Sequence, residues 1–212
     1  MSIDLQLWRA KVIGQWKACV LAGLSIVVTS SDGLAEPQAP DQSAVEQAVY
    51  AYIVRELGSS GTDLPIVLST LNVTPKVTHW LQAEGADIRS VVVHNCAGAG
   101  SLFDQLIQEI SEPADLTGLR SPVPLVLLTK KDIEQLFPDG DSDFDDWQLF
   151  TLRFPQTFGY NVVSRAAVDA KSERALLYLG NVCGGLCGGG GFVFVEKVDG
   201  EWTDKTCWAV IS

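Results

Sequence analysis

The chain has 212 residues, of which 47% are hydrophobic, and a formal net charge of −11 at pH 7. A chain of this length and apolar content can bury one substantial core, and we expect one domain rather than two. The acidic balance, with no basic stripe to release counterions, argues against binding to nucleic acid or to an anionic membrane surface.

The N-terminus has the pattern of a secretory signal peptide, which we place at residues 1–35. Arg9, Lys11 and Lys17 precede an apolar run at residues 18–28, and a small-residue cleavage site follows it. The run is shorter than the ~18 residues that cross a bilayer. A short membrane anchor or a buried helix is the alternative reading of the same residues.

An exported protein, periplasmic or extracellular, is the expected consequence of that leader. Residues 36–42 contain two prolines and are predicted to be a linker, and residues 43–212 are predicted to form a single domain. No other stretch is long and apolar enough to cross a membrane, so we expect no membrane span after cleavage.

Helices are expected where apolar residues recur at helical spacing behind a capping residue. Ser43 and Glu46 form a capping-box pattern, Gly85 is expected to end the second helix, and Thr129 is expected to cap a later one. Short apolar segments between turn residues are expected to be strands. The predicted helices cover residues 43–57, 74–84, 101–110, 130–137 and 143–154, and the predicted early strands cover residues 65–70 and 122–129.

The C-terminal part is predicted to be an antiparallel four-stranded meander. Asp199 and Gly200 supply the two positive-φ positions of a type I′ turn between the last two strands. The fold class is therefore α+β, with helices in the N-terminal half packed on a mainly antiparallel sheet of about four to six strands. The predicted meander strands cover residues 160–168, 174–182, 192–198 and 201–211.

A glycine run joins the second and third of these strands, and we expect it to be a hairpin loop. Successive N–H groups without side chains can cradle a phosphate. The run lacks the Lys-Ser/Thr ending of a phosphate-binding loop, however, and leads into a strand instead of a helix. The glycines of the predicted loop are Gly184, Gly185, Gly188, Gly189, Gly190 and Gly191.

This half of the chain contains, in order, the motifs Ser164-Arg165, Ala175-Leu-Leu-Tyr-Leu179, Cys183-Gly-Gly-Leu-Cys187-Gly, Gly200-Glu-Trp202 and Ile211-Ser212. Their order resembles a family of uncharacterised exported bacterial proteins. The resemblance covers about residues 125–212 and departs from the family pattern at residues 166–168 and 139–146. The family has no assigned activity, so the resemblance implies an architecture and no catalytic residue. Its element order also implies a helix at residues 87–95, where three consecutive valines would favour a strand by propensity.

Four cysteines remain after cleavage of the leader, and an even number in an oxidising compartment predicts two disulfides. Across the Asp199-Gly200 turn, Cys207 should lie opposite Phe192, which is ~16 Å of extended strand from Cys187. Because bridged Cα atoms lie within ~7 Å of each other, we predict that Cys183 pairs with Cys187 and Cys96 with Cys207.

A thiol nucleophile is the alternative use of these cysteines. On a strand, His94 and Cys96 would share one face, so that His94 could deprotonate the thiol. Cys183 and Cys187 could instead form a redox pair. An exported thiol would have to escape oxidation, so we expect no catalytic residue here.

An acidic run before the last predicted helix has the oxygen density of a calcium loop. Asp139, Asp141 and Asp143 are the candidate ligands, but Phe144 and Phe150 occupy positions where the EF-hand pattern requires Gly and Glu. A solvated loop explains the same residues, and we expect no cofactor.

The two tryptophans of the last strand, Trp202 and Trp208, are expected to share one strand face and to cover the core or a sheet edge. Together the patterns predict an exported, disulfide-stabilised, non-enzymatic domain that binds an unidentified protein or small ligand. The alternative is a small exported hydrolase or thiol-redox enzyme that uses Cys96 or the Cys183/Cys187 pair.

Overall fold

The computed structural model describes residues 41–59, 65–69, 75–138, 144–157, 159–184 and 188–211, and the predicted leader lies outside them. The described residues form five helices and a seven-stranded mixed sheet, so the fold is α+β. The helices are α2 (Gln42–Gly58), α3 (Pro75–Asn95), α4 (Gly100–Glu109), α5 (Lys130–Leu136) and α6 (Phe144–Arg153). The strands are β1 (Ile66–Ser69), β2 (Leu125–Leu128), β3 (Tyr160–Val163), β4 (Ala167–Asp169), β5 (Arg174–Val182), β6 (Gly188–Val198) and β7 (Glu201–Ile211).

The sheet has the strand order β2-β1-β3-β5-β6-β7, with β4 also paired to β5. β1 runs parallel to both β2 and β3, and the other pairs are antiparallel. Parallel neighbours need long crossover connections, which are usually helical, and α5 and α6 lie between β2 and β3 in the chain. Most strand pairs are antiparallel, as predicted, but the sheet has seven strands rather than about four to six, and the two parallel pairs of β1 were not predicted. The helices are also not confined to the N-terminal half, because α5 and α6 lie beyond it.

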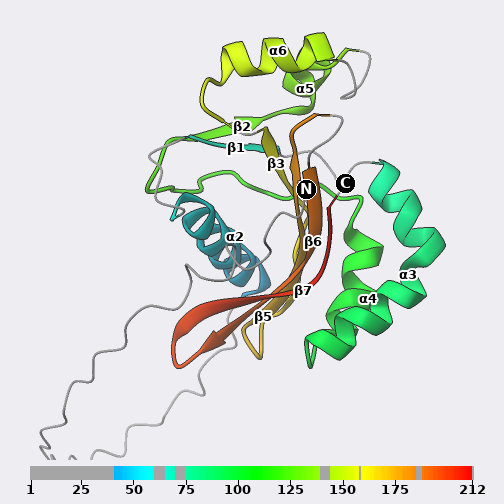
Figure 1. The fold of residues 1–212 in the computed structure, drawn as a ribbon. Helices are drawn as coiled ribbons and strands as arrows, with labels where there is room; N and C mark the ends of the chain where they lie inside the picture. The colour runs from blue at the N-terminus through cyan, green and yellow to red at the C-terminus, as the bar shows by residue number, and fades with distance from the viewer. Residues whose placement is uncertain are drawn as a thin grey trace, which may run out of the picture. The chain divides into compact units, whose positions relative to one another are not determined.

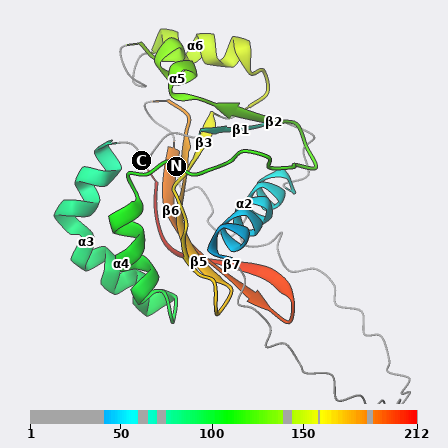
Figure 2. The ribbon, with the colours of Figure 1, turned by 180° about the vertical axis from the view of Figure 1, so that it is seen from behind.

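Helices cover both faces of the sheet (Figures 1 and 2). Side chains alternate across a strand, and β5 shows how this divides the core. Ala175 and Leu177 pack in the cluster formed with α2, whereas Leu176 and Tyr178 pack in the cluster formed with α3 and α4. Both clusters are closed to solvent, so β5 is buried on both sides along this segment.

A third cluster packs α5 and α6 on the first three strands. It shares the face of α3 and α4, because Val182 follows Tyr178 at an even spacing along β5. Aromatic rings fill it, and Trp147 of α6 stacks on Tyr160 of β3 with 6.2 Å between ring centroids and 9° between the planes. The rings in mutual contact are Phe137, Trp147, Phe150, Phe154 and Tyr160.

Two predicted boundaries differ from the structure. α3 continues through Gly85 and includes residues 87–95, as the resemblance implied, so Gly85 ends no helix. Asp41 rather than Ser43 is the N-cap of α2, with the Asp41 carboxylate accepting the Ser43 N–H. The prediction at Thr129 is confirmed, because its side chain and Asp132 form a reciprocal capping box at the start of α5.

The first predicted meander strand, residues 160–168, is broken into β3 and β4. Ser164 lies at the break, is fully buried and uses its hydroxyl to accept the Tyr178 N–H at 2.9 Å. A side-chain acceptor thus satisfies a backbone donor of β5 at the place where the neighbouring strand bends away.

The glycines predicted as a loop are partly strand, because β6 begins at Gly188 and pairs with both β5 and β7. The requirement for glycine is steric at two positions. A Cβ on Gly190 would overlap the Tyr178 hydroxyl, and one on Gly191 would overlap the carbonyl oxygen of Trp208. Residues 188–191 thus belong to the sheet ladder rather than to an open anion nest, while Gly185 lies outside the described residues.

A β-bulge shifts the register of the last hairpin. The Asp199-Gly200 turn is present, with φ values of 53° and 86°. Val193 pairs with Thr206, as that turn requires, but Phe192 pairs with Trp208, which leaves Cys207 as the extra residue. The prediction that Cys207 lies opposite Phe192 was therefore wrong, because a strand pattern alone gives no sign of an inserted residue.

Two glycine substitutions test these close approaches. Gly191→Ala should lower the free energy of unfolding by about 1–3 kcal/mol, because the backbone of β7 leaves no room for the methyl group. Gly85→Ala, inside α3 with nothing within 4 Å, should raise it by about 1 kcal/mol through helix propensity. Urea denaturation of both variants measures the difference, and a Gly191→Ala protein as stable as the wild type would contradict the account.

Candidate functional site

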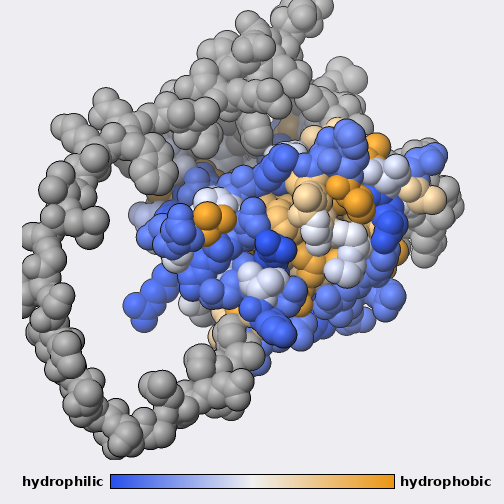
Figure 3. Space-filling model, turned by 90° about the horizontal axis from the view of Figure 1, so that it is seen from below, coloured by the Kyte–Doolittle hydropathy of each residue, from blue (hydrophilic) through white to orange (hydrophobic). Residues whose placement is uncertain are grey.

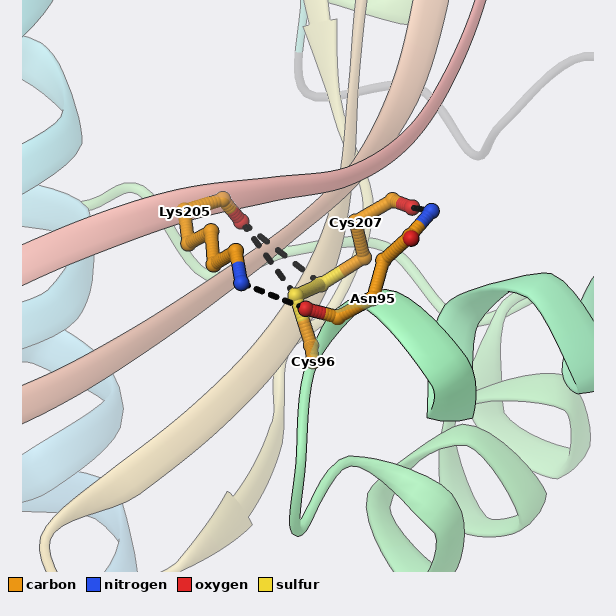
Figure 4. Close-up of a disulfide and its surroundings, with 4 residues drawn as sticks. All are labelled: Asn95, Cys96, Lys205 and Cys207. Atoms are coloured by element: carbon orange, nitrogen blue, oxygen red, sulfur yellow. Dashed lines mark hydrogen bonds between the residues drawn. A yellow bond between two sulfur atoms is a disulfide. The ribbon is translucent and has the colours of Figure 1, made fainter.

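A disulfide ties the end of α3 to β7, the strand at one edge of the sheet (Figure 4). Cys96 and Cys207 are bridged, with 5.5 Å between their Cα atoms, and both are buried. Asn95 Nδ2 donates to the Cys207 carbonyl oxygen at 2.8 Å, and Lys205 Nζ donates to the Asn95 carbonyl oxygen. The pairing predicted for these two cysteines is present, although the register from which it was inferred is shifted.

The second predicted disulfide lies at the border of the described residues. Cys183 is disulfide-bonded, but its predicted partner Cys187 is outside the described residues, so this pairing stays a prediction. Gly184 has a φ of 104°, and a Cβ placed on it would lie 3.7 Å from the indole of Trp147. The start of the glycine run therefore rests on α6.

His94 and Cys96 do not form a nucleophile pair. His94 is exposed in the last turn of α3, so the strand geometry that would align the two side chains is absent. Cys96 is 2% exposed and bridged. Because a nucleophile must be a free thiolate, the bridged form of Cys96 cannot act as one.

The candidate calcium ligands Asp139, Asp141 and Asp143 all lie outside the described residues. Within the described ranges, no three His, Cys, Asp or Glu side chains come together as a possible metal site. The calcium hypothesis therefore stays a prediction about residues 139–143.

A polar cluster fills the break between β3 and β4. Arg165 Nε lies 3.9 Å from a Glu46 carboxylate oxygen on α2 and 3.6 Å from one of Glu109 on α4. The Tyr50 hydroxyl donates to Glu46 at 2.7 Å and accepts the Ala166 N–H at 3.0 Å. Burial, and then Glu46, raise the pKa of Tyr50. Because these groups join helices from the two faces of the sheet, we assign the cluster a structural role.

A surface pocket between α2 and the start of β7 is the best candidate for a binding site, and we name it the α2–β7 pocket. Its volume of about 420 Å³ falls within the range of small-molecule sites. Among the described residues that line it, the charged side chains are two arginines, in a chain whose net charge is negative. Its lining consists of Ala48, Ala51, Tyr52, Arg55, Arg120, Pro122 and Trp202.

Four of the lining residues lie on one face of α2, since positions 48, 51, 52 and 55 follow helical spacing. The opposite wall carries Trp202, which packs against the α2 side of the sheet. Trp208 instead packs with α3 and α4. The prediction that the two tryptophans share a face was wrong, because the bulge at Cys207 lies between them.

Tyr52 forms the inner wall of the pocket and is only 7% exposed. Its hydroxyl donates to an Asp204 carboxylate oxygen at 2.6 Å. Burial raises the pKa of Tyr52, and the hydrogen bond and negative charge of Asp204 raise it further. With its hydroxyl engaged, Tyr52 offers the pocket mainly its ring.

The cations around the pocket differ in their partners. Arg55 lies over the Tyr52 ring, 5.2 Å from its centroid, and 3.4 Å from a Glu56 oxygen. Lys197 Nζ lies 5.8 Å from the centroid of the Trp202 ring and forms an ion pair with Glu173. Within the described part of the chain, Arg120 makes no hydrogen bond or ion pair.

A second pocket, of about 390 Å³, lies beside the disulfide, and we name it the disulfide pocket. It opens beneath the end of α3, and its charged residues have both signs. Asp204 contributes to this pocket while accepting the Tyr52 hydrogen bond from the first, so β7 separates the two. Its lining consists of Cys96, Ala97, Phe194, Glu196, Thr203, Asp204 and Lys205.

The α2–β7 pocket was not predicted from the sequence. Trp202 was expected to cover the core or a sheet edge, and Tyr52, Arg55 and Arg120 were given no role. Three chain segments far apart in sequence build the pocket, so no local motif marks it. The contact between α2 and β7 is a tertiary contact, and the spacing of residues within each element does not predict it.

The face seen from below in Figure 3 is mostly hydrophilic, with one area where hydrophobic and neutral residues gather. No helix in the described ranges has the length and hydropathy needed to cross a membrane. Comparison of the sequence with models of known protein families gives no match, and comparisons with characterised proteins and solved structures give none either.

The Tyr52 hydrogen bond predicts a pH dependence of stability. Because its pKa is raised in the folded state, the folded chain keeps a proton that the unfolded chain loses above about pH 10. This contribution is complete below pH 10 and is lost as pH rises further. The free energy of unfolding should fall above pH 10, and Tyr52→Phe should reduce the slope by up to ~1.4 kcal/mol per pH unit. Urea denaturation between pH 8 and 11 measures the slope, and equal slopes would refute the assignment.

Proposed function

We propose that this chain is an exported, non-enzymatic domain that binds a ligand in the α2–β7 pocket. The observation that carries the proposal is the combination of two arginines with the rings of Tyr52 and Trp202 in one hollow. Ligand sites combine an apolar lining with a few placed polar groups, and this lining has that composition. The described lining residues include no acid–base pair and no nucleophile, and this composition favours binding over catalysis.

Export is the second part of the proposal. The leader pattern of residues 1–35 supports it, and a buried disulfide fits an oxidising compartment. The resemblance to exported bacterial proteins supports it as well. We propose that the consecutive antiparallel strands β5, β6 and β7, with β3 and β4 as the broken first member, correspond to the C-terminal meander of that family.

A thiol-redox enzyme at Cys183 and Cys187 is the second candidate function. The three-residue spacing between these cysteines and the disulfide-bonded state of Cys183 favour it over a hydrolase at Cys96. This function requires that the pair be reducible and reach a substrate in the reduced form.

Peptide mapping without reduction separates these two functions and tests export. The chain is produced with its own N-terminal sequence, alkylated and then digested. We expect a mature N-terminus near Glu36, with Cys96 joined to Cys207 and Cys183 joined to Cys187. A reduced sample, in which all four cysteines become alkylated, is the control. In a parallel sample equilibrated with a glutathione buffer before alkylation, alkylated Cys183 and Cys187 beside an intact Cys96–Cys207 bridge would favour the redox enzyme. An intact leader would contradict export.

Filling the pocket tests the binding function. Ala51 is an exposed α2 residue, and Ala51→Trp should block the hollow without disturbing the core. Ala86→Trp, at an exposed position of α3, is the matched control. Ligand-detected NMR with a mixture of neutral and anionic aromatic fragments should show binding to the wild type and to Ala86→Trp, and at least about tenfold weaker binding to Ala51→Trp. Equal binding to all three proteins would exclude the α2–β7 pocket.

A further inference from the structure

We propose that the ligand of the α2–β7 pocket is a carboxylate carried on a planar apolar group. This inference rests on the proposed function, since it names the ligand class of the same pocket.

The charged side chains of the pocket are Arg55 and Arg120, and none of the described lining residues carries a carboxylate. In a chain with 26 acidic and 15 basic residues, most cations have an acidic neighbour available. Five of the six arginines in the described part of the chain form an ion pair within it. Arg120 is the exception, so its guanidinium is free to meet a carboxylate from outside the chain.

A guanidinium suits a carboxylate because its planar fork donates two parallel hydrogen bonds to the two oxygens. Arg55 lies over the Tyr52 ring and beside Glu56, so it contributes charge while part of its donor capacity is used. Arg120 is therefore the residue we assign to the bidentate contact. The Tyr52 hydroxyl is already bonded to Asp204 and leaves recognition of the anion to the arginines.

The walls define the other half of the ligand. On the α2 side, the small Ala48 and Ala51 lie beside Tyr52 and Arg55, and Trp202 contributes an indole from β7. A ring between small side chains and an indole gains offset or edge contacts that an aliphatic chain would not. Such a carboxylate could be a free small molecule or the C-terminal residue of a peptide, and both share this chemistry.

Three probes test the ligand class. N-acetyl-L-phenylalanine carries the ring and the carboxylate, N-acetyl-L-phenylalaninamide has the same ring without the charge, and inorganic phosphate has charge without a ring. In calorimetric titrations of the full chain, N-acetyl-L-phenylalanine should bind at least about tenfold more tightly than N-acetyl-L-phenylalaninamide. Phosphate should compete only weakly. A peptide that ends in phenylalanine distinguishes the sources, since tighter binding than the single residue would indicate a peptide ligand.

Arg120→Gln should remove the preference for the carboxylate and leave the affinity for the amide unchanged. Arg120 is exposed and forms no ion pair or hydrogen bond with the described residues, so the variant should fold normally. Arg89→Gln on α3, which removes an equal charge from an exposed pair with Asp104, should keep the preference. Equal affinities of the carboxylate and the amide for the wild type, or effective competition by phosphate, would overturn the ligand class. If the Ala51→Trp variant binds every probe as tightly as the wild type does, the proposed function itself would be overturned.

Discussion

One extra residue in the edge strand β7 determines which side chains of this strand face α2 and which face α3 and α4. Because of the bulge, Cys207 and Trp208 both pack toward α3 and α4, although they are adjacent in sequence. Upstream of the bulge, Trp202 and Asp204 still face α2. Cys207 can thus reach Cys96 across 111 residues without turning the tryptophan of the pocket away. Closing a loop of that length constrains the unfolded chain by roughly 4–5 kcal/mol in the chain-entropy model.

The bridge also manages an exposed sheet edge. A free edge strand presents unpaired backbone groups and invites pairing with another chain. Here the end of α3 lies against β7, and the Asn95 side chain donates a hydrogen bond to the carbonyl oxygen of Cys207. Most described residues of β7 stay exposed, and a pocket lies on each side of the strand, with the Tyr52–Asp204 hydrogen bond between the two pockets. The disulfide therefore fixes the strand that forms one wall of the proposed binding site, and a prearranged wall lowers the entropy lost on binding.

Local chemistry made some of this fold predictable. The capping box at Thr129 and the Asp199-Gly200 turn are each written in a few consecutive residues, and both are present. The errors have non-local causes. Gly85 costs about 1 kcal/mol in a helix interior, too little to end α3. The parallel pairing of β1 with two neighbours depends on crossovers that no short pattern specifies. The bulge depends on an insertion that alternation cannot reveal.

The pocket was hidden from sequence for a related reason. An exposed arginine is solvated by water and needs no internal partner. The lack of an ion pair between Arg120 and the described residues therefore costs little stability. The same isolation has a consequence for binding, because an internal carboxylate would compete with any anionic ligand for the guanidinium. The chain has an excess of acidic residues. Arg120 becomes a candidate for ligand binding only when folding brings α2, the segment at residues 120–122 and β7 together around one pocket. The role proposed for Arg120 thus depends on its having no carboxylate partner among the described residues of the folded chain. The amino-acid composition alone does not contain that information.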